Sequence, residues 1–290
     1  MRNLALWLGL LATLSSGFGQ VTVEVTLDQD QFLPAETIVA AVRIANRSGQ
    51  TLLLGGTPDW LTFSVEAREG LIVPKMDEVP VTGEFVLESS KVATKRVNLT
   101  PFFRLTKPGR YSVAASVRIQ PWDKEFSSTP KAFDIIQGTK LWEQDFGVPP
   151  PAGAETTNPE VRKYALQQAN YLKQLRLYLR LTDAAESRTL RLFSLGAMVS
   201  FGRPEPQVDQ QCNLHVLFQT GARSFSYCVV NPDGQVIVRQ TYDYANTRPR
   251  LQVDSAGRFS VTGGARRVTA DDLPPPPVTT PTNDVKTPTL

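Results

Sequence analysis

The sequence predicts an all-β protein with two β domains joined by a linker and one short helix. Three observations carry this prediction. Short stretches of alternating apolar and polar residues, such as Val21–Leu27, recur over residues 20–137 with turn residues between them. The phrase Arg-Pro-x-x-Gln-Val-Asp occurs at residues 203–209 and again at 248–254, an offset of 248 − 203 = 45 residues. Helical periodicity is confined to a few turns after residue 158.

The chain begins with a targeting signal. Arg2 is followed by an apolar run from Leu4 to Leu14 and by small residues at Gly17 and Gly19. This pattern is typical of a secretory signal peptide over residues 1–19, with cleavage after Gly19 leaving Gln20 as the first residue. The apolar run is shorter than the ~20 residues that span a bilayer. We therefore expect an exported protein, periplasmic or secreted, with no membrane span after cleavage.

The composition limits the kinds of partner. The formal net charge is +3, or 30 − 28 = +2 without the leader, which is too small to indicate a nucleic-acid or anionic-membrane partner. One His and two Cys are too few for a multi-His or multi-Cys metal site within one chain. No cofactor motif is present, so we expect no metal and no cofactor.

The first domain, residues 20–137, is predicted to be a β-sandwich. Turn residues such as Asn46–Gly49 and Lys107–Arg110 separate the alternating stretches. About seven short strands with turns between them favour two packed antiparallel sheets. The strands are expected at Val21–Leu27, Thr37–Ile44, 61–65, Val81–Leu87, Lys91–Leu99, Tyr111–Ile119 and Ala132–Ile136.

Two segments of this domain carry a resemblance. Ile44–Leu52 and Leu105–Val113 resemble the hairpin and the Pro-Gly-x-Tyr-x-Val strand entry of immunoglobulin-like modules in exported bacterial proteins. The layout is also similar to that of small bacterial proteinase inhibitor domains. The first resemblance implies an immunoglobulin-like sandwich; the second implies an inhibitory loop, which no segment of this sequence identifies.

Residues 138–158 are predicted to be a linker, because Val148–Ala152 is rich in proline. Trp142 and Phe146 are large for a solvated tether, so this segment either packs on one or both domains or ends the last strand of the first domain. A helix is expected from Pro159 to about Asn170, since Asn158 is a good N-cap and Val161, Ala165 and Ala169 recur at helical spacing.

The second domain, residues 159–269, is predicted to contain the helix and two repeat units of four short strands. The first unit covers about 175–220 and the second about 225–265, and the Arg-Pro phrase leads into the third strand of each. Four strands in about 45 residues is the content of one β-propeller blade. Two blades per chain would close a ring only by association, which implies a homo-oligomer. Residues 270–290, rich in Pro and Thr, are expected to be disordered.

Asp209–Phe218 and Ser226–Gly234 resemble strand entries of the sialidase-type propeller repeats. Cys212 stands where those repeats have a turn glycine, and only two units are present. The resemblance therefore implies blade-like architecture and no glycosidase activity.

The conspicuous side chains are interpreted as structural. Arg203 and Arg248 occupy equivalent repeat positions and are expected to pair with nearby Asp residues, while Asp209 and Asp254 are expected to form turns. His215 has no second His beside it and is assigned a structural role. The register expected for Cys212 and Cys228 disfavours a disulfide between them.

Three classes of function remain. The first is a non-catalytic exported protein-interaction or envelope-associated module, with no catalytic residues. The second is a carbohydrate-binding or glycan-acting protein, with a groove rimmed by Tyr227, Tyr242 and Tyr244. The third is a protease inhibitor or assembly factor. No motif names a reaction, so the first class is the predicted one and the protein is expected not to be an enzyme.

Overall fold

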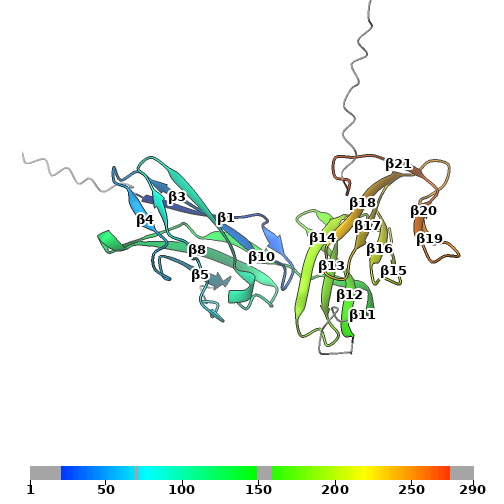
Figure 1. Cartoon of the computed structure of the whole chain (residues 1–290), viewed down its shortest axis with the longest axis horizontal. Helices are drawn as coiled ribbons and strands as arrows, with labels where there is room; N and C mark the ends of the chain where they lie inside the picture. Colours follow the sequence, from blue (N-terminus) through cyan, green and yellow to red (C-terminus); the bar gives the residue numbers. More distant parts are fainter. Residues whose placement is uncertain (1–20, 69–70, 149–158, 275–290) are drawn as a thin grey trace, which may run out of the picture. The chain divides into compact units, whose positions relative to one another are not determined.

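The computed structural model describes residues 21–68, 71–148 and 159–274, and the regular secondary structure of these residues is almost entirely β-strand (Figure 1). The all-β prediction is confirmed, and the described residues contain no helix of seven or more residues. The signal peptide, its expected cleavage between Gly19 and Gln20, the proline-rich stretch at 149–158 and most of the predicted tail lie outside the described residues. The chain divides into two compact units.

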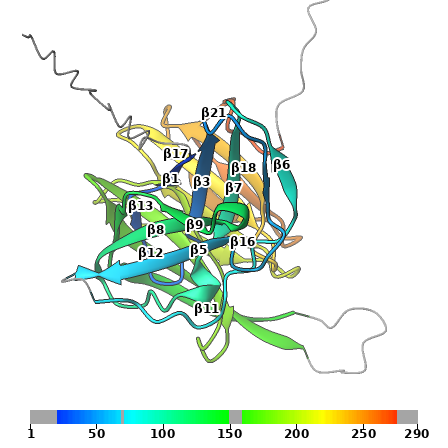
Figure 2. The same ribbon diagram turned by 90° about the vertical axis from the view of Figure 1, so that its left-hand side faces the viewer.

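The first unit contains most of residues 21–132. One sheet has the order β1 (Val21–Leu27), β3 (Val39–Asn46) and β7 (Val92–Asn98), all antiparallel; Figure 2 shows β3 beside β7. A second sheet pairs β5 (Leu61–Ala67) with β8 (Gly109–Ile119), and β9 (Lys124–Ser127) also pairs with β8. A small pair joins β4 (Leu52–Leu54) to β6 (Phe85–Leu87), and two 3₁₀ turns lie at Thr100–Phe102 and Gln120–Trp122.

The core of the first unit follows from the alternation in its sequence. Buried residues alternate with more exposed ones along most of β1, β5 and β8, as expected for strands with one face on a core. Trp60 is 2% exposed, its Nε1 donates a hydrogen bond to the Val81 carbonyl (2.8 Å), and its ring packs edge-on against Phe85. The strand expected at Val81–Leu87 is shorter than predicted, because only Phe85–Leu87 pairs with a neighbour.

The second unit contains residues 133–274 together with two short segments, 29–37 and 105–110. The first of these segments contains β2 (Gln31–Phe32), which pairs in parallel with β10 (Lys131–Ile135). Its first sheet has the order β11 (Thr139–Val148), β12 (Glu160–Tyr171), β13 (Gln174–Asp183) and β14 (Thr189–Ala197). Its second sheet has the order β15 (Glu205–Val208), β16 (Leu214–Gln219), β17 (Ser224–Val230), β18 (Val236–Asp243) and β21 (Ala265–Arg267). A separate hairpin pairs β19 (Arg250–Val253) with β20 (Phe259–Thr262).

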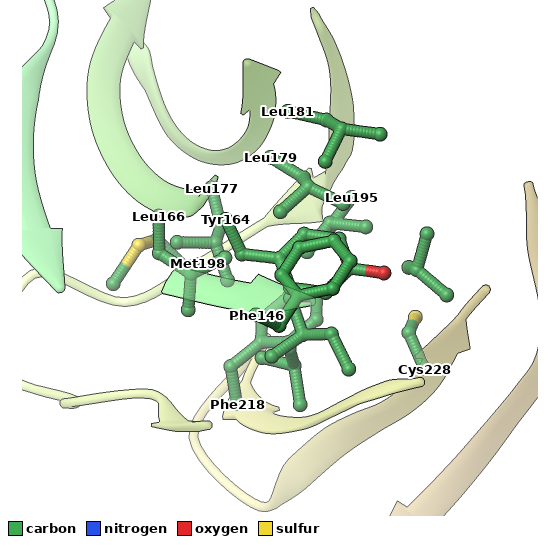
Figure 3. Packing of buried hydrophobic residues seen from close by; sticks show 13 residues of the cluster. Phe146, Tyr164, Leu166, Leu177, Leu179, Leu181, Leu195, Met198, Phe218 and Cys228 are labelled. Carbon is green, nitrogen blue, oxygen red and sulfur yellow. The ribbon is translucent and has the colours of Figure 1, made fainter. Parts of the chain in front are cut away.

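The two larger sheets of this unit share one core. Leu177, Leu179 and Leu181 of β13 project into it, as does Phe218 of β16 (Figure 3). Val216 of β16 belongs to the same cluster. The cluster also takes residues from β11, β12, β14 and β17, all buried. This mutual burial makes the second unit a sandwich of two sheets.

The predicted blade units are not formed by the described strands. Residues of the first copy are divided between the two sheets, because β13 and β14 belong to one and β15 and β16 to the other. In the second copy, β17 and β18 lie in a sheet while β19 and β20 form the separate hairpin. Sequence similarity at a fixed offset revealed a repeated local structure, but it did not determine how the strands pair over longer distances.

The repeated structure is a turn between two strands. In each case the first residue of the turn accepts a backbone hydrogen bond from the residue three positions later, which has positive φ. The same turn occurs a third time between β17 and β18. The pairs of first residue and positive-φ residue are Asp209 and Cys212 (φ 65°), Asn231 and Gly234 (φ 75°), and Asp254 and Gly257 (φ 76°). Cys212 therefore occupies a position that favours glycine.

Gly257→Ala is expected to lower the stability of the β19–β20 hairpin by about 1–2 kcal/mol, the usual cost of the left-handed conformation for an L-residue. A Cβ at Gly257 would meet only Gln210 Nε2, at 3.6 Å, so steric overlap adds little. Hydrogen exchange of the hairpin amides measures the effect. Gly221→Ala, at a glycine without positive φ and with room for a Cβ, is the control and should not weaken its own turn.

The two repeated phrases lie side by side. Glu205 Oε1 accepts a hydrogen bond from Arg250 Nη1 (2.8 Å), and Glu205 Oε2 accepts one from the Leu251 amide (3.0 Å). Glu205 and Arg250 are equivalent positions, since 250 − 205 = 45. The repeat thus places the start of β15 against the start of β19.

The predicted helix at 159–170 is wrong, and so is the linker predicted for residues 139–148; residues 149–158 of that linker lie outside the described residues. Residues Thr139–Val148 form β11, and Glu160–Tyr171 form β12, which pairs with β11 on one side and β13 on the other. Tyr164 and Leu166, two residues apart, point into the shared core, while Ala169 packs on the opposite face. Because both faces of β12 are buried, apolar residues occur on both of them, and some of these residues fall at helical spacing.

The second face of β13 is also covered. Tyr178 is fully buried against Leu33, Ala169 and Leu192. Arg176 and Arg180 on the same face are half-buried. Residues 29–37, which contain Leu33, cover this face, and the sequence of β13 alone does not indicate that cover.

Candidate functional site

A cleft of about 480 Å³ opens on the second unit beside two edge strands. One wall comes from β11 and the neighbouring β12, and the other from the segment that connects β14 to β15 and from β15 itself. Both β11 and β15 stand at the end of their sheets in strand order. The lining residues are Lys140, Leu141, Trp142, Gln168, Ser200, Gly202, Arg203, Pro204 and Pro206.

The β11 wall is shaped by an irregularity in strand pairing. Lys140 pairs with Gln167 and Trp142 with Leu166, so Leu141 is an extra residue in β11. Such a bulge bends an edge strand and changes the direction of its side chains. Trp142 is half-buried, because it packs against the shared core while also lining the cleft.

The opposite wall is stiff and carries a cation. Pro204 and Pro206 fix their own φ angles and have no backbone N–H. Arg203 between Gly202 and Pro204 is exposed, and no hydrogen bond or ion pair to its guanidinium is found among the residues that the structure describes. The cleft therefore combines an aromatic side chain, a planar cation and two rigid prolines.

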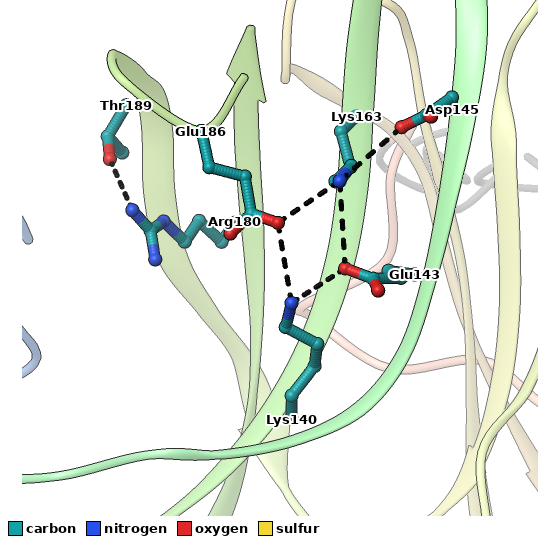
Figure 4. A network of polar contacts seen from close by, with 7 residues as sticks. All are labelled: Lys140, Glu143, Asp145, Lys163, Arg180, Glu186 and Thr189. Carbon is teal, nitrogen blue, oxygen red and sulfur yellow. Dashed lines mark hydrogen bonds and ion pairs between the residues drawn. The ribbon is translucent and has the colours of Figure 1, made fainter. Parts of the chain in front are cut away.

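Lys140 belongs to a network of charged residues on β11, β12 and the β13–β14 turn (Figure 4). Its Nζ lies 2.6 Å from Glu143 Oε2 and 3.4 Å from Glu186 Oε1. Lys163 Nζ also bonds to Glu186 Oε1, at 3.1 Å, and lies 3.8 Å from Asp145. The hydrogen bond to Glu143 raises the pKa of Lys140, and the hydrogen bond from Lys163 lowers the pKa of Glu186.

Because of this network, the charges of the two cations in the cleft are neutralised to different degrees. The Lys140 ammonium already has two carboxylate partners, so its charge is largely offset. The Arg203 guanidinium has none among the described residues. An anionic group entering the cleft would therefore find its free charge partner in Arg203.

The predicted pairing of Arg203 and Arg248 with aspartates is wrong for the described residues. Arg248 lies over the ring of Phe225, 5.2 Å from its centroid, and Arg203 lines the cleft. Asp254 pairs instead with Arg258 (2.9 Å). The four repeat positions are not gathered at one site, since Asp209 and Asp254 begin separate turns.

Asp209, His215 and Tyr227 form a second polar group that sequence reasoning did not assemble. Tyr227 Oη lies 2.7 Å from His215 Nδ1, and His215 Nε2 lies 3.1 Å from Asp209 Oδ2. Burial raises the pKa of Tyr227 to about 12, so its hydroxyl is protonated and is able to donate to His215 Nδ1 or accept from it. Burial favours a higher pKa for Asp209, but hydrogen bonds from Asn213 and His215 outweigh it and lower that pKa. The His215 Nε2–H therefore donates to a carboxylate.

This trio is enclosed. Tyr227 is 7% exposed and belongs to an apolar cluster with Leu217 and Leu251, which also packs against Phe259 of the β19–β20 hairpin. The Phe259 ring stacks on His215 with centroids 4.5 Å apart. Hydroxyl, imidazole and carboxylate thus satisfy one another beneath the hairpin, which agrees with the structural role assigned to His215.

The expected tyrosine-rimmed groove is not part of the cleft. Tyr227 is buried, the Tyr242 hydroxyl donates to Gln240 (2.9 Å), and Tyr244 lies under the guanidinium of Arg223. None of the three lines the cleft. The sequence did carry a signal for the aromatic that does line it, because Trp142 was unusually large for a linker.

The cysteines and acidic residues provide no further chemistry. Cys212 and Cys228 are free, and burial raises the pKa of Cys228. The Cys212 Sγ lies 3.2 Å from the Gly147 carbonyl of β11. Within residues 21–68, 71–148 and 159–274, no group of three or more His, Cys, Asp or Glu side chains is arranged to hold a metal ion. No helix in these same ranges is long and apolar enough to cross a membrane.

No protein-family model matches this chain, and no curated protein does. Among solved structures, a sporulation control protein from Bacillus subtilis is similar at 10% sequence identity, with a TM-score of 0.31. The match covers 61% of this chain and 91% of that chain. A likeness of this degree carries no argument about the fold or the function of this chain.

Proposed function

We propose that this chain is a non-catalytic, exported binding protein, associated with the cell envelope or secreted, that holds its partner in the cleft of the second unit. The observation that carries the proposal is that Trp142 and Arg203 line one cleft of about 480 Å³ and that the Arg203 guanidinium has no partner among the described residues. This volume falls within the ~300–1,000 Å³ of ordinary ligand sites. Half-buried aromatics and arginines are the side chains that most often dominate binding energy.

The enclosed Asp209–His215–Tyr227 trio supports a non-catalytic reading. A carboxylate, an imidazole and a hydroxyl in line are the parts of a nucleophilic site. Here the hydroxyl is 7% exposed and the imidazole is covered by Phe259. A substrate would have to displace the β19–β20 hairpin to reach them, so the trio is better suited to hold that hairpin than to react.

The cleft is tested by comparing the mature chain with Trp142→Ala and Arg203→Ala on arrays of glycans and peptides. Each substitution should weaken binding to the captured ligand about tenfold or more, since each removes a central aromatic or a charged contact. Trp122→Ala and Arg104→Ala, at a half-buried tryptophan and an exposed arginine of the first unit, are matched controls. Equal binding by the cleft variants and the wild type would contradict the proposal.

Export is tested separately. Expression of the full chain with its own leader should give a processed protein that begins at Gln20, because small residues occupy Gly17 and Gly19 before the cut. Mass spectrometry of the intact protein measures this directly. Substitution of Gly19 by a bulky residue should slow processing, and an unprocessed wild-type chain would contradict the exported assignment.

A carbohydrate-binding function is the second candidate, and Trp142 is the observation that favours it. Sugar rings present an apolar C–H face that packs well on an aromatic ring, while their hydroxyls need planar polar partners. Gln168, Ser200 and Arg203 supply such partners in the same cleft.

A further inference from the structure

We infer that the cleft between β11 and β15 binds a carboxylate-bearing sugar, a uronic acid unit of an acidic polysaccharide. The sugar ring would stack on Trp142 and its carboxylate would bind the Arg203 guanidinium. This inference rests on the proposed binding function and specifies the chemistry of its ligand.

The two edge strands that border the cleft are poorly suited to add a peptide strand. Pro204 and Pro206 remove backbone donors from the start of β15, and the extra residue at Leu141 interrupts the regular ladder of β11. Farther along β11, the Gly147 carbonyl already accepts a contact from Cys212 Sγ. Recognition therefore depends on side chains, which favours a compact ligand over an extended peptide.

The lining matches a hydroxyl-rich ring. Trp142 supplies an aromatic surface fixed by its packing against the shared core. Gln168 offers both a donor and an acceptor, and Ser200 offers a hydroxyl. The other apolar residues of the lining are Leu141, Gly202 and two prolines, and none of them is aromatic.

Charge selects an acidic sugar over a neutral one. The Arg203 fork can bind a carboxylate with two parallel hydrogen bonds, and Arg203 has no such partner in the described structure. Lys140, the other cation of the cleft, is already held by Glu143 and Glu186. One cation without a carboxylate partner in the described part of the chain fits one carboxylate per site and is a poor match for densely charged phosphate polymers.

The test is titration calorimetry of the mature full chain with trigalacturonate and with a hyaluronan tetrasaccharide, using galactotriose as the neutral control. At least one acidic oligosaccharide should bind about tenfold or more tightly than galactotriose, and added salt should reduce the difference. Arg203→Ala and Arg203→Lys should both remove most of this preference, because lysine keeps the charge but lacks the fork. Trp142→Phe should retain part of the affinity and Trp142→Ala very little.

The outcomes separate the two claims. Binding of neither acidic sugar, equal binding of galactotriose, or binding that is insensitive to Arg203 would overturn the uronic acid assignment. If the binding of an array ligand of another class still depends on Trp142, the proposed binding function stands and only the uronic acid assignment fails. If binding is instead lost in Trp122→Ala, the site lies in the first unit and both claims fail.

Discussion

Phe218→Ala is expected to lower the free energy of unfolding of the second unit by about 3–5 kcal/mol, the usual loss for a large aromatic removed from a core. Phe218 is 1% exposed and lies in β16, all six residues of which are buried. It belongs to the cluster shared by both sheets, and its ring lies 3.7 Å from the Cβ position of Gly196 in the other sheet. One substitution should therefore weaken both sheets together.

Urea unfolding followed by hydrogen exchange of β13 and β16 peptides measures this effect. Phe201→Ala is the matched control, because Phe201 lies in the same unit but is 76% exposed, and its loss should change stability by less than about 0.5 kcal/mol. Destabilisation of the β16 sheet alone would show that the two sheets do not share a core.

Asp209→Asn is expected to cost about 2 kcal/mol, within the ~1–3 kcal/mol for leaving a buried polar group unsatisfied. The Asp209 and His215 side chains are 10% and 11% exposed, so water cannot easily replace the lost carboxylate. Asparagine keeps the oxygen that accepts the Asn213 amide, so the turn itself should survive. The loss then reports on the contacts of Asp209 Oδ2 with His215 Nε2 and with Asn213 Nδ2.

The pH dependence of this loss has a definite sign. Hydrogen bonds hold the pKa of Asp209 below its ordinary value, so its ionised form stabilises the fold above the unfolded pKa of ~4. That contribution is lost as pH falls through the lowered folded pKa. The stability difference between wild type and Asp209→Asn should therefore shrink under acid conditions.

Asp254→Asn is the matched control for this second prediction. It occupies the equivalent repeat position, but its partner Arg258 is 82% exposed and no histidine is involved. Asp254→Asn should lower the stability by clearly less than Asp209→Asn, as is usual for surface ion pairs. Equal losses at both positions would show that the His215 link contributes nothing.

Local patterns in the sequence predicted much of the secondary structure and less of the topology. Alternation identified β1, β5, β8 and β13, because each of these strands buries one clear face or a continuous leucine row. The same rule failed for β12, where burial of Tyr164 on one face and Ala169 on the other hid the period of two.

The repeat illustrates the same limit. Its offset correctly aligned two turns, down to the positive-φ position shared by Cys212 and Gly257. It could not show that β15 would pair into a sheet while β19 would form a separate hairpin, because strand pairing depends on contacts between distant residues. Glu205 and Arg250 carry opposite charges at equivalent positions, and that difference is what joins the two copies.

The candidate site was the part of the structure that the sequence predicted least well. Arg203 was identified from the repeat and Trp142 from its size, but they are 61 residues apart (203 − 142 = 61) and no local pattern connects them. Both residues line the same cleft because β11 and β15 stand at the ends of their sheets in strand order. The same topology buries Tyr227, which the sequence placed on a binding rim.

The indole N–H signals of the mature, ¹⁵N-labelled chain test the central claim most directly. Cleavage after Gly19 would leave three tryptophans, Trp60, Trp122 and Trp142, and single Trp→Phe variants assign their signals. Addition of the uronic acid oligosaccharides should shift the Trp142 signal while those of Trp60, bonded to Val81, and Trp122, near Gln50, stay in place. A bound ligand that leaves Trp142 unshifted, or shifts Trp122 instead, would contradict the assignment of the cleft.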